Sequence, residues 1–381
     1  MQDKLSRPGF KNTKRILVKI GSRVLNTGKD LNYRVIERIC DDLSMLKDRG
    51  MDIGIVSSGA IAAGNALLGI RDSNISLSKK QALAAIGQGR LMSAYNDAFS
   101  RYGYKVAQIL ITLEDLENRK RYLNVRKTLG ALLDFGVIPI INENDTVAVE
   151  EIQFTDNDTL ASMIIPIIEA NMLIILTDTE GVYSSDPKRT KDAQRISVIE
   201  RLKPSDIDKA SPFAGKWGRG GLESKLRAAY HASLLGVPTV IASAYTDHVV
   251  SGIIDGKDLG TLVLPSKSKK MTPRVHWMGF VKRPRGKISV DDGATKAILN
   301  SGKSLLPCGV LNVEGDFKTG DAVEILDKDG KVIAVGLTNF PSHEVEQIKG
   351  ANTNDIVKIL GKECDEEIVH RDNMILRKEM V

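Results

Sequence analysis

The sequence has few of the side chains that cross-link proteins or bind metal ions. Its 381 residues include three cysteines, Cys40, Cys308 and Cys364, which lie far apart and show no paired spacing. This pattern fits a reduced, cytosolic protein and argues against a disulfide scaffold or a structural zinc site. The five histidines are equally scattered, so a histidine-rich metal centre is not expected.

Long apolar segments are absent as well. No run approaches the roughly 20 apolar residues of a membrane-spanning helix, and residues 1–13 are polar, without the apolar core of a signal peptide. We therefore expect a cytoplasmic protein that does not enter a membrane. Hydrophobic residues at 42% and charged residues at 27% are ordinary for a globular protein, and the length allows two domains.

Positive charge is in modest excess and is unevenly distributed. The formal net charge is +6. Residues 273–381 hold 16 Lys and Arg against 17 Asp and Glu, so the preceding residues 1–272 carry an excess of +7. A basic surface there could attract RNA, anionic nucleotides or acidic substrates, and charge alone does not choose among them.

The most informative stretch is an apolar run that ends abruptly in amides and carboxylates. Residues 137–141 predict a short buried strand, and Asn142-Glu143-Asn144-Asp145 marks its carboxyl end. Ligands bind at the carboxyl ends of strands in parallel α/β sheets. A second polar cluster, Asp156-Asn157-Asp158, precedes an amphipathic helix. Asp156 or Asp158 could simply cap that helix, but capping does not account for the whole cluster, so we expect a polar binding site.

Two earlier strand ends are also suited to a ligand. Residues 14–20 alternate like a strand, with Lys19 just before a glycine turn. Lys19 is either a solvated lysine on an edge strand or a phosphate-binding cation. The strand at residues 53–56 runs into the small residues 57–64. These either let a helix N-terminus approach an anion or serve close helix–sheet packing, and the hydroxyl of Ser58 favours the ligand.

Two later segments could contact a nucleotide. The strand at residues 172–176 ends in Thr177 and Asp178, and Asp178 could close a turn or face a ligand. The glycine-rich segment 215–221 opens a helix with Lys225 one turn inside. The spacing is not that of a Walker loop, but such a loop suits a polyphosphate. Similar loops also serve as lids that bind nothing.

Strands and helices alternate through the first two thirds of the chain. Helices are predicted at 32–49, 78–99 and 114–135, and further strands at 106–111 and 238–242. This pattern predicts a mostly parallel sheet covered on both faces. A basic linker bounded by serine and proline, residues 266–273, separates this domain, 1–265, from a second domain, 274–381. Short strands between glycine turns make the second domain typical of a small β-barrel or sandwich.

Several motifs in this order resemble those of a known family. They are Val18–Ser22, Val56–Gly64, Gln81–Gln88, Ile141–Asp145, Asp156–Asp158 and the lysine-bearing glycine loop, followed by Val290–Ala294 and Ser304–Pro307. Over nearly its whole length the chain resembles the glutamate 5-kinase family, amino acid kinases that open proline biosynthesis and carry a C-terminal PUA domain. The resemblance implies an α/β three-layer sandwich with a mostly parallel central sheet, plus a small β-rich PUA domain.

The resemblance also implies an activity and a set of residue roles. The activity is ATP-dependent phosphorylation of the side-chain carboxylate of L-glutamate to L-glutamyl 5-phosphate. The catalytic residues would be Lys19, Lys225 and Asp158, with Asp158 orienting the two lysines. Glutamate would bind to Ser58, Asp145 and Asn157. ATP would bind to Lys19, Thr177, Asp178, Arg219, Gly220, Gly221, Leu222, Glu223, Ser224 and Lys225. Two departures from the family are Arg219, where threonine is usual, and Thr155, where glycine is usual.

Elementary chemistry agrees with these roles. The side-chain carboxyl of free glutamate, whose pKa is ordinarily about 4.3, is ionised at neutral pH and needs no general base. The obstacle is the approach of one anion to another, the γ-phosphate. Lys19 and Lys225 could converge on the phosphoryl oxygens, with Mg²⁺ bridging the phosphates. No residue is assigned to the metal.

Other expectations come from the family alone. These are a homo-oligomer (a dimer or a tetramer), functional coupling to glutamate-5-semialdehyde dehydrogenase, which would take up a labile acyl phosphate, and feedback inhibition by proline. Two alternatives stay open. One is a kinase for a related acid, such as aspartate or N-acetylglutamate. The other is RNA binding by the PUA domain, for which the obvious cations are Lys282, Arg283, Arg285 and Lys287.

Overall fold

The chain divides into two compact units, residues 1–270 and 271–381, and the boundary in the sequence falls inside the predicted linker. The computed structural model describes residues 7, 9–28, 30–70, 75–148, 156–185, 190, 192–210, 221–267 and 270–377. None of the helices in these ranges has the length and apolar character needed to span a membrane.

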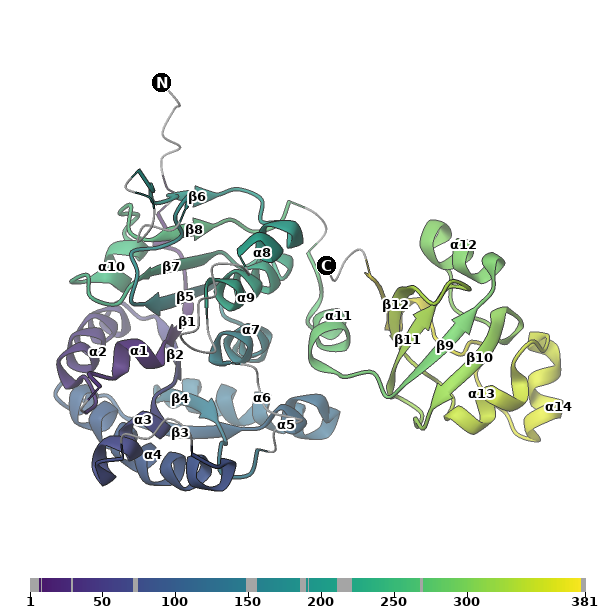
Figure 1. The fold of residues 1–381 in the computed structure, drawn as a ribbon, viewed down its shortest axis with the longest axis horizontal. Coiled ribbons are helices and arrows are strands. Elements are labelled where there is room, and N and C mark those ends of the chain that lie inside the picture. The colour runs from purple at the N-terminus through teal and green to yellow at the C-terminus, as the bar shows by residue number, and fades with distance from the viewer. Residues whose placement is uncertain are drawn as a thin grey trace. The chain divides into compact units, whose positions relative to one another are not determined.

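An eight-stranded sheet forms the middle layer of the larger unit (Figure 1). Its order in space is β3 (Val106–Ile111), β4 (Ile138–Glu143), β2 (Asp52–Ser57), β1 (Arg15–Ile20), β5 (Met172–Thr177), β7 (Thr239–Ser243), β8 (Thr261–Val263) and β6 (Val198–Ile199). Neighbouring strands are parallel except for β7 and β8. The prediction of a mostly parallel sheet is confirmed.

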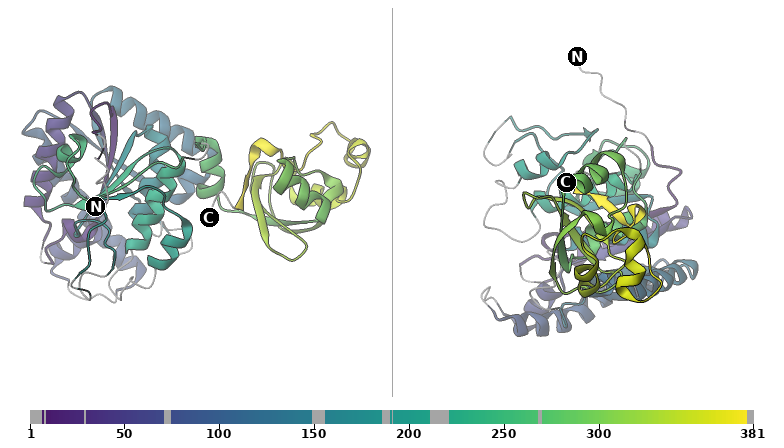
Figure 2. Two further views of the ribbon diagram at one scale, coloured as in Figure 1. Left: turned by 90° about the horizontal axis from the view of Figure 1, so that it is seen from above. Right: turned by 90° about the vertical axis from the view of Figure 1, so that its right-hand side faces the viewer.

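Helices cover both faces of this sheet, as Figure 1 and Figure 2 show. One face packs in a single hydrophobic core with α2 (Tyr33–Asp48), α4 (Leu77–Ser100) and α10 (Val249–Ile254). The other face contacts α6 (Arg119–Asp134), α7 (Asn157–Ile168) and α9 (Leu222–Leu234). Shorter helices are α1 (Ser22–Leu25), α3 (Ala60–Leu68), α5 (Leu113–Glu117) and α8 (Pro204–Ala210).

Two sequence predictions need correction here. The single helix expected at 114–135 is broken at Asn118, because the Asn118 side chain accepts hydrogen bonds from the Lys120 and Arg121 N–H groups and begins a new helix. The edge-strand interpretation of Lys19 is wrong, because β1 pairs with β2 on one side and β5 on the other.

Strand β1 shows how the sheet directs its side chains. Ile16, Val18 and Ile20 belong to the core shared with α2 and α4. Successive side chains of a strand point to opposite faces, so Leu17 and Lys19 face the layer of α7 and α9. Lys19 is only 4% exposed. The alternation therefore places Lys19 in the interior, on the face of the sheet where α7 begins.

The smaller unit is built on one five-stranded sheet within its described residues. Its order is β10 (Val310–Gly315), β9 (Gly286–Val290), β11 (Ala322–Leu326), β12 (Val332–Leu337) and β13 (Met374–Leu376), antiparallel except for β9 with β11. The helices are α11 (Pro273–His276), α12 (Asp292–Ser301), α13 (Ser342–Ile348) and α14 (Ile356–Leu360). Side chains from strands and helices share one apolar core. The β-rich prediction is confirmed.

Candidate active site

A pocket of about 470 Å³ opens at the carboxyl ends of four central strands. Its lining comes from β1, β4 and β5, from the segments that follow β1, β2, β4 and β5, and from α4, α7 and α9. Among the sequence-predicted site residues, the lining includes Lys19, Ser58, Asp145, Asn157, Thr177, Asp178 and Lys225. Such a position is where open α/β sheets bind ligands, so segments distant in sequence form one polar site.

At one side of the pocket, two lysines meet a single buried carboxylate. Lys19 Nζ lies 2.6 Å from Asp158 Oδ1, and Lys225 Nζ lies 3.2 Å from Asp158 Oδ2. The Ser224 hydroxyl donates to Asp158 Oδ2 at 2.9 Å. Asp158 has no exposed surface and does not line the pocket, whereas both lysines do. With all three groups ionised, this Lys19–Asp158–Lys225 cluster carries a net charge of +1.

Opposing effects set the protonation of this cluster. Burial would raise the pKa of the Asp158 carboxyl, but Lys19, Lys225 and the Ser224 hydroxyl together hold that pKa below its usual value. Burial lowers the pKa of Lys19, and the positive charge of Lys225 acts in the same direction, while Asp158 opposes both. Electrostatic interactions are stronger in a dry interior than in water, so the excess positive charge is well placed to attract an anion.

The neighbouring acid, Asp156, has a different role in the structure. It is the N-cap of α7, and its side chain accepts a hydrogen bond from the Thr159 N–H at 2.8 Å. Capping therefore accounts for Asp156 and leaves Asp158 for the lysines.

A set of amides lies beside the cluster. Asn157 Nδ2 is 2.8 Å from Ser58 Oγ, 3.0 Å from the Ser57 carbonyl and 2.9 Å from Asn142 Oδ1. Asn142 lines the pocket and is 2% exposed, yet sequence reasoning gave it no role. The available signal was its place as the first polar residue after the apolar run.

Asp145 lies partly buried in the turn after β4. Burial raises the pKa of its carboxyl to about 6. No cation among the described residues forms an ion pair with it. An ionised Asp145 is therefore poorly solvated, and a cationic group of a ligand would relieve that cost.

The α3 side of the pocket offers backbone donors. Gly59 precedes α3 with a φ of 107°, a conformation that favours glycine, and no side chain caps this helix. Gly64 and Gly87 let α3 and α4 cross closely, since a Cβ on Gly64 would lie 2.1 Å from the Leu83 carbonyl oxygen. Gly64 thus serves close packing, although against α4 rather than the sheet, and anion binding at the helix start after Gly59 stays a prediction.

The end of β5 supplies the other side of the pocket. The Thr177 hydroxyl donates to Asp178 Oδ1 at 3.1 Å, and Arg23 Nη1 lies 3.9 Å from Asp178 Oδ2. Arg23 also lines the pocket and was missed by sequence reasoning. Lys80 and Gln81 of α4 are further lining residues without an assigned role.

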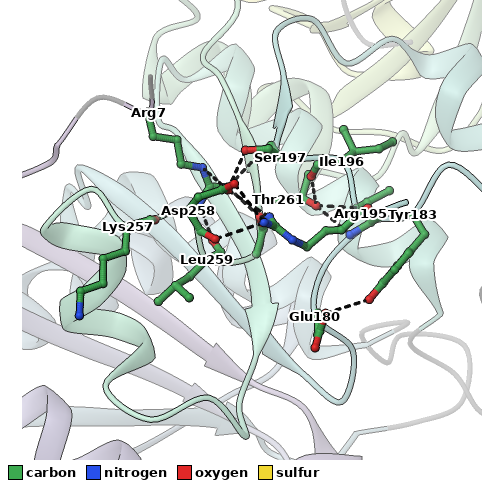
Figure 3. Close-up of polar contacts among 12 residues, drawn as sticks. Arg7, Glu180, Tyr183, Arg195, Ile196, Ser197, Lys257, Asp258, Leu259 and Thr261 are labelled. Atoms are coloured by element: carbon green, nitrogen blue, oxygen red, sulfur yellow. Dashed lines mark hydrogen bonds and ion pairs between the residues drawn. The ribbon is translucent and has the colours of Figure 1, made fainter. Parts of the chain in front are cut away.

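The loop after β5 is supported by a polar network that reaches the N-terminal segment (Figure 3). The Thr261 hydroxyl accepts from the Val182 N–H at 2.8 Å and donates to the Ile196 carbonyl at 2.6 Å. Beside it, Arg7 donates to the carbonyls of Ser197 at 2.7 Å and Gly260 at 2.8 Å. These contacts hold β6, β8 and the loop carrying Val182 together.

The glycine loop is described only in part. Arg219 and Gly220, together with Thr155, lie outside the described residues. Gly221 is the N-cap of α9 and has no side-chain cap hydrogen bond. Leu222, Glu223 and Ser224 form the first turn of α9 and do not line the pocket. Of the predicted loop residues that are described, Lys225 is the one that reaches the pocket.

Metal-binding capacity within the described ranges is modest. Those residues contain no group of three or more His, Cys, Asp or Glu side chains that could hold an ion by themselves. The pocket does contain single carboxylates, including Asp178 at the end of β5. Mg²⁺ typically takes one or two protein carboxylates, with phosphate oxygens and waters completing its shell.

Comparison with known proteins follows the division into units. Residues 14–243 match the amino acid kinase family, and residues 286–360 match the PUA domain. The glutamate 5-kinase of Syntrophus aciditrophicus (strain SB) is 45% identical over 366 residues, which cover 96% of this chain and 94% of that protein. The glutamate 5-kinase of Syntrophotalea carbinolica is also 45% identical, over 96% of this chain and 98% of that protein.

A UMP kinase structure from Bacillus anthracis aligns with a TM-score of 0.47 at 16% identity, covering 68% of this chain and 99% of that chain. The family match extends over more than half of the sequence, and the two relatives align along nearly all of it. The chain therefore belongs to the amino acid kinase family, where it groups with the glutamate 5-kinases, and it carries a PUA domain after its kinase domain.

Proposed function

We propose that the chain is a glutamate 5-kinase, which uses ATP to convert L-glutamate into L-glutamyl 5-phosphate and ADP, the first step of proline biosynthesis. The observation that carries the proposal is the Lys19–Asp158–Lys225 cluster beside a polar pocket, in a chain similar to glutamate 5-kinases over nearly its full length.

The cluster suits the electrostatic demand of the reaction. An oxygen of the glutamate side-chain carboxylate attacks the γ-phosphorus, and the bond from that phosphorus to the β–γ bridging oxygen breaks, so ADP leaves with the electron pair. Negative charge on the transferring group must be stabilised throughout. Lys19 and Lys225 would do this as catalytic residues, because preorganised cations in a dry site act strongly on developing charge. Asp158 would be a positioning residue that keeps both ammonium groups aimed at one point.

The amino acid would bind at the β4 side of the pocket. Its α-ammonium group would pair with Asp145, whose carboxylate lacks a cation among the described residues. Ser58 and Asn157 would complete the site, since they lie 2.8 Å apart and both line the pocket. This arrangement would place the side-chain carboxylate towards the two lysines.

The nucleotide would bind at the β5 side. Thr177, Asp178 and the segment Arg219–Lys225 would contact it, with Gly221 opening a helix whose N–H groups favour phosphate. Mg²⁺ would bind together with ATP and would partly neutralise the charge of the phosphates. Asp178 is the protein carboxylate best placed to contribute an oxygen, because it lies on the pocket wall at a strand end.

The remaining parts of the proposal concern the whole protein. The catalytic domain would be residues 1–265 and the PUA domain residues 274–381, in a cytoplasmic homo-oligomer that is inhibited by proline and coupled to the next enzyme of the pathway. RNA binding has little support from the smaller unit. Lys282 there lies 3.3 Å from Asp321 and over the Trp277 ring, and the exposed members of that cluster are Arg283, Arg285 and Lys287.

A hydroxamate assay tests the proposal directly, because hydroxylamine traps an acyl phosphate. With ATP and Mg²⁺, we expect product from L-glutamate and far less from L-aspartate or N-acetyl-L-glutamate. Lys225→Met serves as the inactive control for contaminating kinases. Product from N-acetylglutamate in preference to glutamate would contradict the proposed substrate, and no product from any acid would contradict the proposed reaction.

A further inference from the structure

Four side-chain amides form a hydrogen-bonded chain from the pocket to the β3 edge of the sheet. Asn157 Nδ2 donates to Asn142 Oδ1 at 2.9 Å, and Asn142 Nδ2 donates to Gln88 Oε1 at 3.0 Å. Gln88 Nε2 then donates to Gln108 Oε1 at 3.3 Å. Asn142 is 2% exposed and Gln88 is 7% exposed. Gln88 lies on α4, where Gly87 permits a close crossing with α3.

The direction of this amide chain is fixed at its pocket end. A side-chain amide can turn over and exchange its donor and acceptor ends, but the Ser57 backbone carbonyl can only accept. Because Asn157 faces that carbonyl at 3.0 Å, its NH₂ group must point there. Asn142 must then offer its oxygen to Asn157 and its NH₂ group to Gln88. Each amide therefore has one orientation that satisfies its neighbours.

This direction determines what the pocket presents to a ligand. With its NH₂ group committed to protein acceptors, Asn157 offers its carbonyl oxygen Oδ1, a hydrogen-bond acceptor. Ser58 Oγ accepts from Asn157 at 2.8 Å, so the Ser58 hydroxyl proton is available to a ligand acceptor. Asp145, further along the lining, is a second acceptor. The wall thus offers acceptors to an ammonium group and a donor to a carboxylate.

We propose that Gln88 is a positioning residue that stabilises this polarity, which the Ser57 carbonyl fixes at the pocket end. Its oxygen holds Asn142 in the orientation that lets Asn157 turn an acceptor towards the substrate ammonium group. Without that oxygen, Asn142 would be freer to turn its own NH₂ group towards Asn157, where two donors would oppose each other. Gln88 would therefore act on substrate recognition without touching the substrate. The inference rests on the proposed glutamate kinase function.

The test is a polarity series at position 88, with the glutamate KM, the ATP KM, kcat and Tm measured for each variant. Gln88→Glu keeps an acceptor, Gln88→Met keeps only the shape, and Gln88→Lys supplies only donors. Among the three variants, we expect the glutamate KM to be lowest in Gln88→Glu. In Gln88→Met it should rise about five- to tenfold, which corresponds to the loss of one neutral hydrogen bond. In Gln88→Lys it should rise further. The ATP KM should stay within about twofold of the parent.

This order separates positioning from a structural role or a simple charge effect. If Gln88 only filled space, Gln88→Met would be the mildest change and the two charged variants would be equally harmful. If local charge alone mattered, Gln88→Lys would improve binding of a substrate with two carboxylates and a net charge of −1, and Gln88→Glu would weaken it. Either result would overturn the proposal. Should Gln88→Lys fail to fold, the comparison of Gln88→Met with Gln88→Glu still decides.

A matched control lies on the same helix. Tyr95 is fully buried, and its hydroxyl is 2.9 Å from Ser57 Oγ, outside the amide chain. Tyr95→Phe removes one buried hydrogen bond and should lower Tm while leaving the glutamate KM unchanged. If the parent protein phosphorylates no glutamate, the proposed function fails. If it is active but the variants show no polarity order, only the inference about Gln88 fails.

Discussion

Lys19 and Asp158 form a buried ion pair, with 2.6 Å between Nζ and Oδ1, although one comes from the central strand β1 and the other from the first turn of α7. Lys225 adds a second positive charge on the other carboxylate oxygen. Removing either lysine would leave a neutral pair, whereas removing the carboxylate would leave two like charges. The three residues should therefore respond differently to substitution.

Lys19→Ala and Lys225→Ala should each lower kcat by about 10²–10³, the usual effect of removing one preorganised stabilising donor. The folded state should survive, because Asp158 keeps one cationic partner. Steady-state kinetics and circular dichroism on the purified variants check both statements. Near-parental turnover in either variant would exclude that lysine from the phosphoryl group.

Asp158→Asn should lower stability as well as turnover. Breaking a buried pair by removing one partner typically costs about 3–5 kcal/mol, and here two ammonium groups would face each other. Loss of the Asp158 charge, which now opposes the lowering of the Lys19 pKa, should lower that pKa further, so activity should be lost at a lower alkaline pH than in the parent. Denaturant unfolding and a pH–rate profile measure the two effects. Asp255→Asn, which breaks the surface pair with Arg49, is the matched control and should change neither.

Asp145 should make the glutamate KM depend on pH. Burial raises the pKa of its carboxyl to about 6, so below that pH the group is protonated and cannot pair with an ammonium ion. The KM should therefore fall as pH rises through about 6. At pH 8, Asp145→Ala should raise the glutamate KM by roughly tenfold to a thousandfold, because a charge-assisted hydrogen bond is lost and the substrate ammonium group is left without a partner. The ATP affinity should be nearly unchanged.

The same pKa shift gives Asp145 a distinguishing effect on stability. A folded-state pKa above the unfolded value means that this group favours folding at low pH and loses that contribution as pH rises through about 6. Asp145→Ala should therefore not lower Tm at pH 8. A lower Tm with unchanged glutamate kinetics would show that Asp145 only closes the turn after β4.

His276 should make the smaller unit sensitive to acid. It is fully buried in α11, and burial lowers its pKa to about 4, against about 6.5 in the unfolded chain. The unfolded state takes up the proton first, so stability is lost as pH falls from about 6.5 to about 4. Between pH 7 and 5 the loss from this group is about 2 kcal/mol. Hydrogen exchange of residues 271–377 should show it, and His276→Leu should remove it.

A chain truncated after Lys270 should fold and phosphorylate glutamate. The larger unit has its own hydrophobic core, and every proposed site residue lies within it. The hydroxamate assay on the truncated protein, together with its melting curve, checks this. A well-folded but inactive product would show that the smaller unit completes the site or an oligomer on which the site depends.

Local sequence determined much of the architecture. The alternation of apolar residues in β1, the capping residues Asn32 and Asn118 and the switch from apolar to polar residues after β4 are all set by near neighbours. The prediction of strands, helices and a polar strand end therefore needed only these patterns. The helix break at Asn118, which was not predicted from the sequence, is also a local feature, because asparagine is a common N-cap residue at the start of a helix.

Only the tertiary structure decided which polar residues act together. Asp156 and Asp158 are the same residue type two positions apart, but the first turn of α7 places one against the Thr159 N–H group and the other against two lysines. Whether Lys19 lay at an edge or in the centre depended on strand order. The amide chain joins Gln88 to Asn142 across two elements. Strand order and helix packing arise from contacts between distant segments, and no local pattern along the chain encodes them.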